Sequence, residues 1–127
     1  MIKMLRIALP VDRNTEDATI FEHFGRAPYY MLVDIENGKI RKIEFIKNPM
    51  IDHRPGDIPN MLRYHGVNTL ICRGIGRRAR TFFQQYGIEI ITGAGGKALD
   101  AIKMFLEGKL VSREYIPRQR WHETEPH

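Results

Sequence analysis

Short apolar runs, separated by clusters of glycine, proline and polar residues, divide the chain into strands and helices. Apolar and β-branched residues dominate five such runs, and their length and composition predict strands. Asn37-Gly38 lies between the second and third runs and predicts a hairpin, because both central positions of the tight turn need positive φ. The predicted strands are residues 4–11, 29–35, 40–46, 67–72 and 88–92.

Three other segments carry apolar residues at helical spacing. They cover 58–62, 79–86 and 97–106, and Asp57 is expected to cap the first of them. The apolar stripe of the second helix is expected to face the sheet. The glycines expected to end the helices are Gly66, Gly87 and Gly108.

The resulting order is β-β-β-α-β-α-β-α, in which a hairpin is followed by crossover units. Crossovers of this kind make their strands parallel, so the sequence predicts an α/β fold with a mixed five-stranded sheet flanked by helices. We expect one domain over residues 1–110. Residues 111–127 read as a polar, partly ordered C-terminal tail.

Composition fits a globular domain and disfavours other classes. The chain has 127 residues, 43% hydrophobic and 28% charged, and no apolar run approaches the length of a membrane span. Lys3 and Arg6 interrupt any signal-peptide core. Cys72 is the single cysteine, which excludes an internal disulfide or a four-cysteine metal site within one chain and suits a reducing cytoplasm.

Positive charge indicates an anionic partner without identifying it. The formal net charge is +5 and the isoelectric point is about 9.6. Nucleic acid, phosphates and an anionic cofactor all satisfy this condition.

Two glycine-rich turns are the most informative local feature. Gly74-Ile75-Gly76 and Gly93-Ala94-Gly95-Gly96 each follow a predicted strand and open a predicted helix. Ligands bind at this edge of open α/β sheets, where backbone N–H groups at helix starts attract anions. Short strand-to-helix turns also need glycine for their own geometry, but two adjacent turns favour a site.

The first turn also matches a dinucleotide-binding pattern, which we disfavour. Gly74 to Ala79 fits G-x-G-x-x-A, yet the next strand ends in 90–93 without the carboxylate that would hold a ribose. Arginines surround the turn and oppose the helix dipole unless an anion offsets them. A solvated basic face is the commoner explanation of such a charge run. These arginines are Arg73, Arg77, Arg78 and Arg80.

The segment before the second strand, 21–30, reads FEHFGRAPYY and combines an imidazole, a guanidinium and several aromatic rings. Together with 4–11, the 72–79 turn, and Tyr86-Gly87-Ile88 with Gly93, the His23-Phe24-Gly25-Arg26-Ala27-Pro28 string resembles the dinitrogenase iron-molybdenum cofactor biosynthesis family. The similarity extends over nearly the whole chain up to Leu110.

The resemblance implies a ribonuclease H-like fold and a non-catalytic protein that carries or inserts iron-molybdenum cofactor or a related iron-sulfur cluster. By position, His23, Gly25 and Arg26 would line the pocket, with Gly74 and Gly76 opposite. Some relatives have histidine-rich sequence in the loop after the third strand, where this chain has His53. The full expected cofactor-binding set is His23, Phe24, Gly25, Arg26, Gly74, Gly76, Arg77, Gly93 and Gly95.

His23, His53 and Cys72 are the candidate metal ligands, because clusters accept imidazole and thiolate donors. For Cys72, a role as a small buried apolar residue is the favoured alternative. Cluster-assembly proteins are the expected protein partners, and neither a membrane nor nucleic acid is favoured.

Two other functions compete with the carrier. A ribonuclease H-like nuclease needs several carboxylates around metal ions, and Asp12 and Asp34 are the candidates, with no third acidic residue evident beside them. A general nucleic-acid binder would use the arginines and the high isoelectric point.

Overall fold

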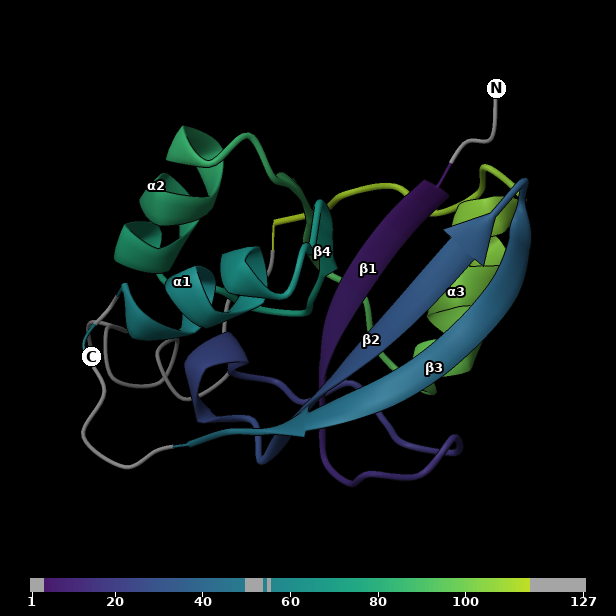
Figure 1. Ribbon diagram of the computed structural model, residues 1–127, viewed down its shortest axis with the longest axis horizontal. Helices are drawn as coiled ribbons and strands as arrows, with labels where there is room; N and C mark the ends of the chain where they lie inside the picture. The colour runs from purple at the N-terminus through teal and green to yellow at the C-terminus, as the bar shows by residue number, and fades with distance from the viewer. Residues whose placement is uncertain (1–3, 50–53, 55, 115–127) are drawn as a thin grey trace, which may run out of the picture.

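The computed structural model describes residues 4–49, 54 and 56–114. It contains a five-stranded sheet with the order β3-β2-β1-β4-β5 (Figure 1). β2 is antiparallel to both of its neighbours, whereas β1, β4 and β5 are parallel to one another. The predicted mixed sheet is therefore confirmed. The strands are β1 (Met4–Val11), β2 (Tyr29–Glu36), β3 (Lys39–Lys47), β4 (Thr69–Ile71) and β5 (Glu89–Ile91).

Helices cover both faces of the sheet. α1 (Asp57–Tyr64) and α2 (Arg77–Gln85) lie on one face, and α3 (Ala98–Leu106) lies on the other (Figure 1). A short 3-10 helix, η1 (Phe24–Arg26), precedes β2. No helix in the described part of the chain is long and apolar enough to cross a membrane.

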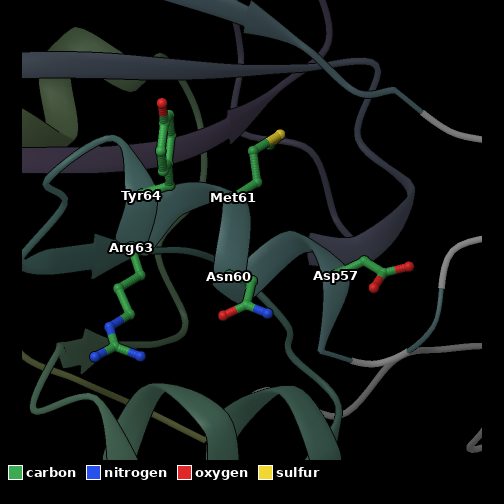
Figure 2. Close-up of a pocket in the computed structure, with 5 residues that line it drawn as sticks. All are labelled: Asp57, Asn60, Met61, Arg63 and Tyr64. Atoms are coloured by element: carbon green, nitrogen blue, oxygen red, sulfur yellow. The ribbon is translucent and has the colours of Figure 1, made fainter.

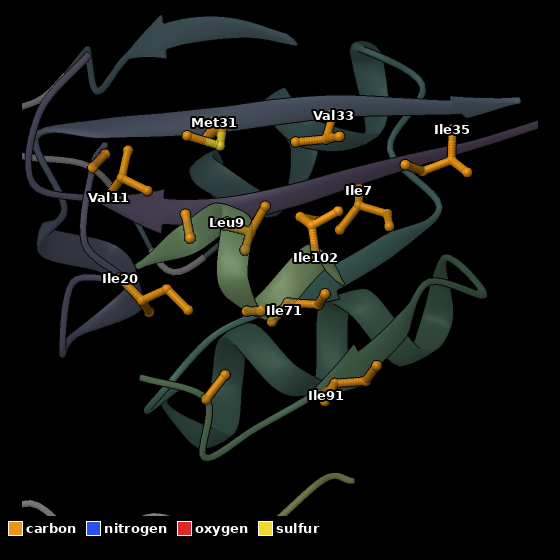
Figure 3. Close-up of a cluster of buried hydrophobic side chains, with 14 residues drawn as sticks. Ile7, Leu9, Val11, Ile20, Met31, Val33, Ile35, Ile71, Ile91 and Ile102 are labelled. Carbon is orange, nitrogen blue, oxygen red and sulfur yellow. The ribbon is translucent and has the colours of Figure 1, made fainter. Parts of the chain in front are cut away.

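Both faces of the two central strands are buried, which explains their near-continuous apolar sequence. Ile7, Leu9 and Val11 of β1 alternate onto the α3 side, where they pack with Ile102 (Figure 3). Ala8 belongs to the second cluster, on the α1 and α2 side. The sheet thus separates two apolar cores.

The hairpin forms as its sequence predicts. Asn37 and Gly38 both have positive φ, 52° and 78°, and they join β2 to β3. Close to this turn, Arg6 of β1 holds Asp34 of β2 through two hydrogen bonds, one from Nε to Oδ1 at 2.7 Å and a second from Nη2 to Oδ2 at 2.9 Å. Asp34 is thereby committed to a structural ion pair.

Two helix predictions are corrected. The N-cap of α1 is Gly56, and Asp57 is the first helical residue, whose carboxylate accepts a hydrogen bond from the backbone of Arg54. In α2, Phe83 is buried in the core, but Phe82 contacts Gly56 at the start of α1 and Tyr86 bonds to α1. The stripe therefore faces α1 as well as the sheet, because the two helices pack side by side.

Candidate functional site

The two glycine-rich turns lie next to each other at the carboxyl ends of β4 and β5. The N–H of Gly93 donates to the carbonyl of Arg73 (3.0 Å), and the N–H of Ala94 donates to that of Cys72 (3.1 Å). Parallel strands deliver their following turns to one edge. This edge is the one at which open α/β sheets bind ligands.

The segment before β2 reaches the same edge and pairs with the first turn. His23 forms an isolated parallel bridge with Gly74. The N–H of Phe24 donates to the carbonyl of Gly74, and the N–H of Gly74 donates to the carbonyl of Glu22, both at 3.1 Å. The structure thus brings the His23–Arg26 segment beside the start of α2.

A pocket of about 370 Å³ opens where η1, α1 and α2 meet. We call it the η1–α2 pocket. Apolar side chains from η1 and α1 form part of its wall, and two glycines bring bare backbone to it. The lining residues are Phe24, Gly25, Ile58, Gly76, Arg77, Arg78 and Ala79.

Gly76 leaves the start of α2 open. It is the N-cap residue, with extended φ and ψ of −71° and 157°, and no side chain caps the helix. A Cβ atom at Gly76 would meet nothing within 4 Å. The first N–H groups of a helix have no partner inside the helix, so this open space gives an anion access to them.

The charge of α2 is arranged against its dipole. Its first turn contains Arg77 and Arg78 and no acidic residue. None of the ion pairs formed among the described residues involves an arginine of α2. Positive charge at a helix N-terminus is unfavourable unless negative charge offsets it, so the arrangement favours an anionic ligand.

His23 and Arg26 lie at the same edge but are not among the residues that line the η1–α2 pocket. The His23 side chain is 38% exposed, and its Nε2 atom lies 3.7 Å from Oε1 of Glu22. Arg26 is exposed at the end of η1. Both residues are therefore accessible to a ligand larger than the pocket.

Gly93 and Gly95 lie away from the η1–α2 pocket. Gly93 has φ of +84°, and a Cβ atom there would lie 2.8 Å from both the Cβ and the carbonyl oxygen of Arg113. A Cβ at Gly95 would lie 3.6 Å from Nη1 of Arg73. The second turn therefore makes room for the protein's own C-terminal segment.

Cys72 is fully buried between the sheet and the α1–α2 layer, in the cluster that contains Phe24 and Phe83. Burial raises the pKa of its thiol to about 12, and the Arg80 guanidinium offsets part of this rise. The thiol is therefore neutral at ordinary pH. It packs as a small apolar residue and does not line the η1–α2 pocket.

Metal ligation is not preorganised by the described residues. Within residues 4–49, 54 and 56–114 there is no group of three or more histidine, cysteine or acidic side chains that could hold a metal ion. His53 lies outside the described residues. Ligation by His23, His53 or Cys72 stays a prediction.

Three lining residues of the η1–α2 pocket, Ile58, Arg78 and Ala79, were not in the expected cofactor-binding set, although Arg78 was recognised among the arginines around the first turn. Ile58 looks like an ordinary core residue of α1, and its place in the pocket depends on how α1 packs against η1. Arg78 and Ala79 lie at the helix start just after the glycine turn, and this position in the sequence could have indicated that they line the pocket.

A larger, more open pocket of about 520 Å³ follows α1, and Figure 2 shows its lining. Arg63 and Asn60 point toward α2, while Met61 and Tyr64 point to the other side of α1. The Arg63 guanidinium lies 4.4 Å from the centre of the Tyr86 ring, and the Tyr86 hydroxyl donates to Asn60 (2.8 Å). These contacts join the two helices, so we assign Asn60 and Arg63 a structural role.

The family profile described as dinitrogenase iron-molybdenum cofactor matches residues 5–108. The chain belongs to this family. An uncharacterized protein of Methanocaldococcus jannaschii is 37% identical over 112 residues, which cover 86% of this chain and 92% of that protein. The match extends through the η1–α2 pocket, and it ends before Ser112, Arg113 and Glu114.

Solved structures show the same fold. The crystal structure of PH0822 has a TM-score of 0.79 and 36% identity, covering 86% of this chain and 96% of that one. The apo form of the orange protein of Desulfovibrio gigas has a TM-score of 0.77 and 21% identity, covering 91% and 98%. At 21% identity, the likeness to the orange protein shows the fold alone.

Proposed function

We propose that the chain is a non-catalytic binding and carrier protein for iron-molybdenum cofactor or a related iron-sulfur or metal cluster. The observation that carries this proposal is the pairing of His23 with Gly74. This pairing brings the uncapped, arginine-rich start of α2 close to η1, which supports a single receptor for negative charge formed by both elements. Membership of the family supports a cluster as that anion.

A preformed metal-sulfide cluster suits the chemistry of this edge. It is a bulky anion, which backbone N–H groups and guanidinium groups stabilise without requiring four cysteines. Arg77 and Arg78 supply the positive charge, and the apolar side chains of Phe24 and Ile58 limit the access of water. The pocket would hold one face of the cluster, and His23 and Arg26 would contact the part that protrudes.

Among the candidate ligands, His23 is the best placed. Its imidazole is partly exposed, so it is accessible to a ligand from solvent. A thiolate at Cys72 would require the local core to open, because burial keeps the thiol protonated. Gly93 and Gly95 would act through the shape of the second turn, without contacting the cluster.

We also propose that the fold is ribonuclease H-like, that the protein is cytoplasmic and that its partners are cluster-assembly proteins. The strand order with β2 antiparallel to its neighbours supports the ribonuclease H-like assignment. One cysteine suits a reducing cytoplasm. A carrier of clusters would exchange its cargo with cluster-assembly proteins.

The geometry does not support the nuclease alternative. Asp34 pairs across the sheet with Arg6, whereas Asp12 follows the other end of β1 and accepts a hydrogen bond from the backbone of Thr19. Six residues of strand separate the two positions by roughly 20 Å. Metal ions of a two-metal nuclease lie about 4 Å apart, so these carboxylates do not form such a site.

Anaerobic reconstitution with iron, sulfide and molybdate tests the proposal. Absorbance and metal analysis after gel filtration would compare the natural chain with a double variant, Arg77→Gln with Arg78→Gln, and with His23→Ala. The matched controls are Arg41→Gln on β3 and His65→Ala at the end of α1, both outside the η1–α2 pocket.

We expect the double variant to retain at least about tenfold less cluster than the natural chain, because hydrogen bonds to charged groups contribute about 1.5–3 kcal/mol each. His23→Ala should also lose cluster, while both controls match the natural chain. Equal retention by all variants, or no retention by the natural chain, would overturn the carrier assignment.

A further inference from the structure

A third, smaller pocket of about 220 Å³ is lined by three arginines beside the first glycine turn. We call it the three-arginine pocket. Among the described residues, Arg77 is the one that lines both this pocket and the η1–α2 pocket. Its main lining residues are Arg73, Gly74, Arg77, Arg80, Thr92 and Glu114.

The C-terminal segment forms one wall of this pocket. The N–H of Arg113 donates to the carbonyl of Thr92 (2.8 Å), and the N–H of Thr92 donates to Oγ of Ser112 (3.0 Å). The buried hydroxyl of Thr92 donates to the carbonyl of Arg113. Because Gly93 has no Cβ, the segment can pack directly on the second turn. These contacts place Glu114 at the pocket.

Two arginines of this pocket, Arg77 and Arg80, take part in no ion pair among the described residues. Both lie near the start of α2, where the helix dipole adds to their positive potential. Glu114 is the acidic residue of the lining, yet no ion pair among the described residues joins it to Arg77 or Arg80. A diffuse, incompletely neutralised positive site of this kind attracts a small anion.

The size of the pocket selects the class of anion. Pockets for drug-sized ligands and cofactors span about 300–1,000 Å³, and this one is smaller. Guanidinium groups match the geometry of tetrahedral oxyanions, to which they donate paired hydrogen bonds. A free oxyanion therefore fits better than a nucleotide.

We propose that the three-arginine pocket binds a small tetrahedral oxyanion such as phosphate or sulfate, and that Glu114 acts as its internal competitor. The family match ends at residue 108, so this device depends on the chain's own C-terminal segment. The site requires no cluster, and its test is independent of the carrier proposal.

NMR titration with inorganic phosphate, and separately with sulfate, tests the site, with chloride holding the ionic strength constant. Shifts of the arginine Nε–H signals would give the affinity. Arg80→Gln should weaken binding by about tenfold, since a charged hydrogen bond is lost. Arg80→Lys should restore part of the affinity, and Arg41→Gln, a surface arginine of β3, should leave it unchanged.

Glu114→Gln should strengthen binding of both anions by roughly threefold to tenfold, because it removes a competing charge at the pocket. Gly93→Ala should have a similar effect, since its Cβ would displace Arg113. Gly96→Ala is the matched control: Gly96 also has positive φ, +76°, but its Cβ would meet nothing within 4 Å.

Saturable shifts confined to the arginines of the pocket, with tighter binding in Glu114→Gln, would support the proposal. Weak shifts spread equally over surface arginines would overturn it, as would unchanged affinity in both Glu114→Gln and Arg80→Gln. Thermal unfolding of each variant would confirm that it is folded. Success here with failed cluster reconstitution would remove only the carrier function.

Discussion

Cys72 follows β4 within a layer of aromatic and aliphatic side chains, beneath the arginines that line the candidate site. Burial raises the pKa of its thiol from 9.0 to about 12. Tyr30 is also buried, and burial raises the pKa of its hydroxyl above its usual value of 10.0. Both groups therefore favour the protonated state in the folded protein.

This shift predicts how stability depends on pH. Between about pH 9 and 10 the unfolded chain loses the Cys72 proton and the folded chain keeps it, so the free energy of unfolding should fall as pH rises. The limiting slope is about 1.4 kcal/mol per pH unit. Urea unfolding of the natural chain and of Cys72→Ala at pH 8, 9 and 10 would measure it.

Cys72→Ala should show a clearly smaller decline over this interval, each protein being compared with its own value at pH 8. Parallel declines in the two proteins would show that the thiol titrates similarly when folded and unfolded. A neutral thiol should also be unreactive toward thiol reagents until the protein unfolds.

At single positions, the sequence predicted which segments lie near each other better than it predicted which side chains are in contact. The meeting of His23 with Gly74 follows from strand order, because the segment before β2 and the turn after β4 flank β1. The packing of Gly93 against Arg113 depends on a polar segment with no periodic pattern. Nothing in the sequence signalled that contact.

At the scale of elements, α2 combines weak capping with unfavourable charge. Its N-cap is glycine, and arginines occupy its first turn. Serine or aspartate at an N-cap accepts a hydrogen bond from the helix start, which glycine cannot do. The ordinary stabilising residues are missing where the proposed ligand would bind.

Substitutions at Gly76 should have different effects on the stability of the protein and on its retention of a cluster. Gly76→Ser should stabilise the protein by a few tenths of a kcal/mol, and Gly76→Asp by about 1 kcal/mol, because its charge also favours the helix dipole. Both side chains fit the space and the backbone conformation. Only Gly76→Asp should impair cluster retention, since its carboxylate would repel the anion.

Thermal unfolding and anaerobic reconstitution of the two variants would check this pair of effects. If Gly76→Asp bound cluster as well as Gly76→Ser, then the helix start would not be the anion-binding element. If both variants were destabilised, the backbone at Gly76 would differ from its extended N-cap conformation.

Elements whose conformation is determined by their own local sequence were predicted well, whereas features that depend on tertiary packing were not. Asn37-Gly38 determines its own turn, so the hairpin followed from the sequence. β4 and β5 contain three residues each and are shorter than their apolar runs, and the flanking residues Val67, Cys72 and Ile88 are buried although they lie outside the strands. The packing of α2 against α1 also depends on tertiary contacts.

At the scale of the whole molecule, the sheet lies between two apolar cores and contributes side chains to both. Ile7, Leu9 and Val11 of β1 point into the α3 core (Figure 3), and Ala8 belongs to the core beneath α1 and α2. Neither core can therefore open without disturbing this central strand. The site rests on the α1–α2 side. Its geometry should therefore depend on α3, although α3 contributes no lining residue among those described.

Ile102→Ala tests this coupling. Ile102 is fully buried on α3, and its truncation should reduce the free energy of unfolding by about 2–5 kcal/mol. If the shared strand β1 makes the two layers unfold together, native-state hydrogen exchange should show the same loss for the slowest amides of α2 and of α3. Met104→Ala on the exposed face of α3 is the control and should cost far less. Loss of protection in α3 alone would mean that the two layers unfold separately, and that the site retains its structure when the opposite core fails.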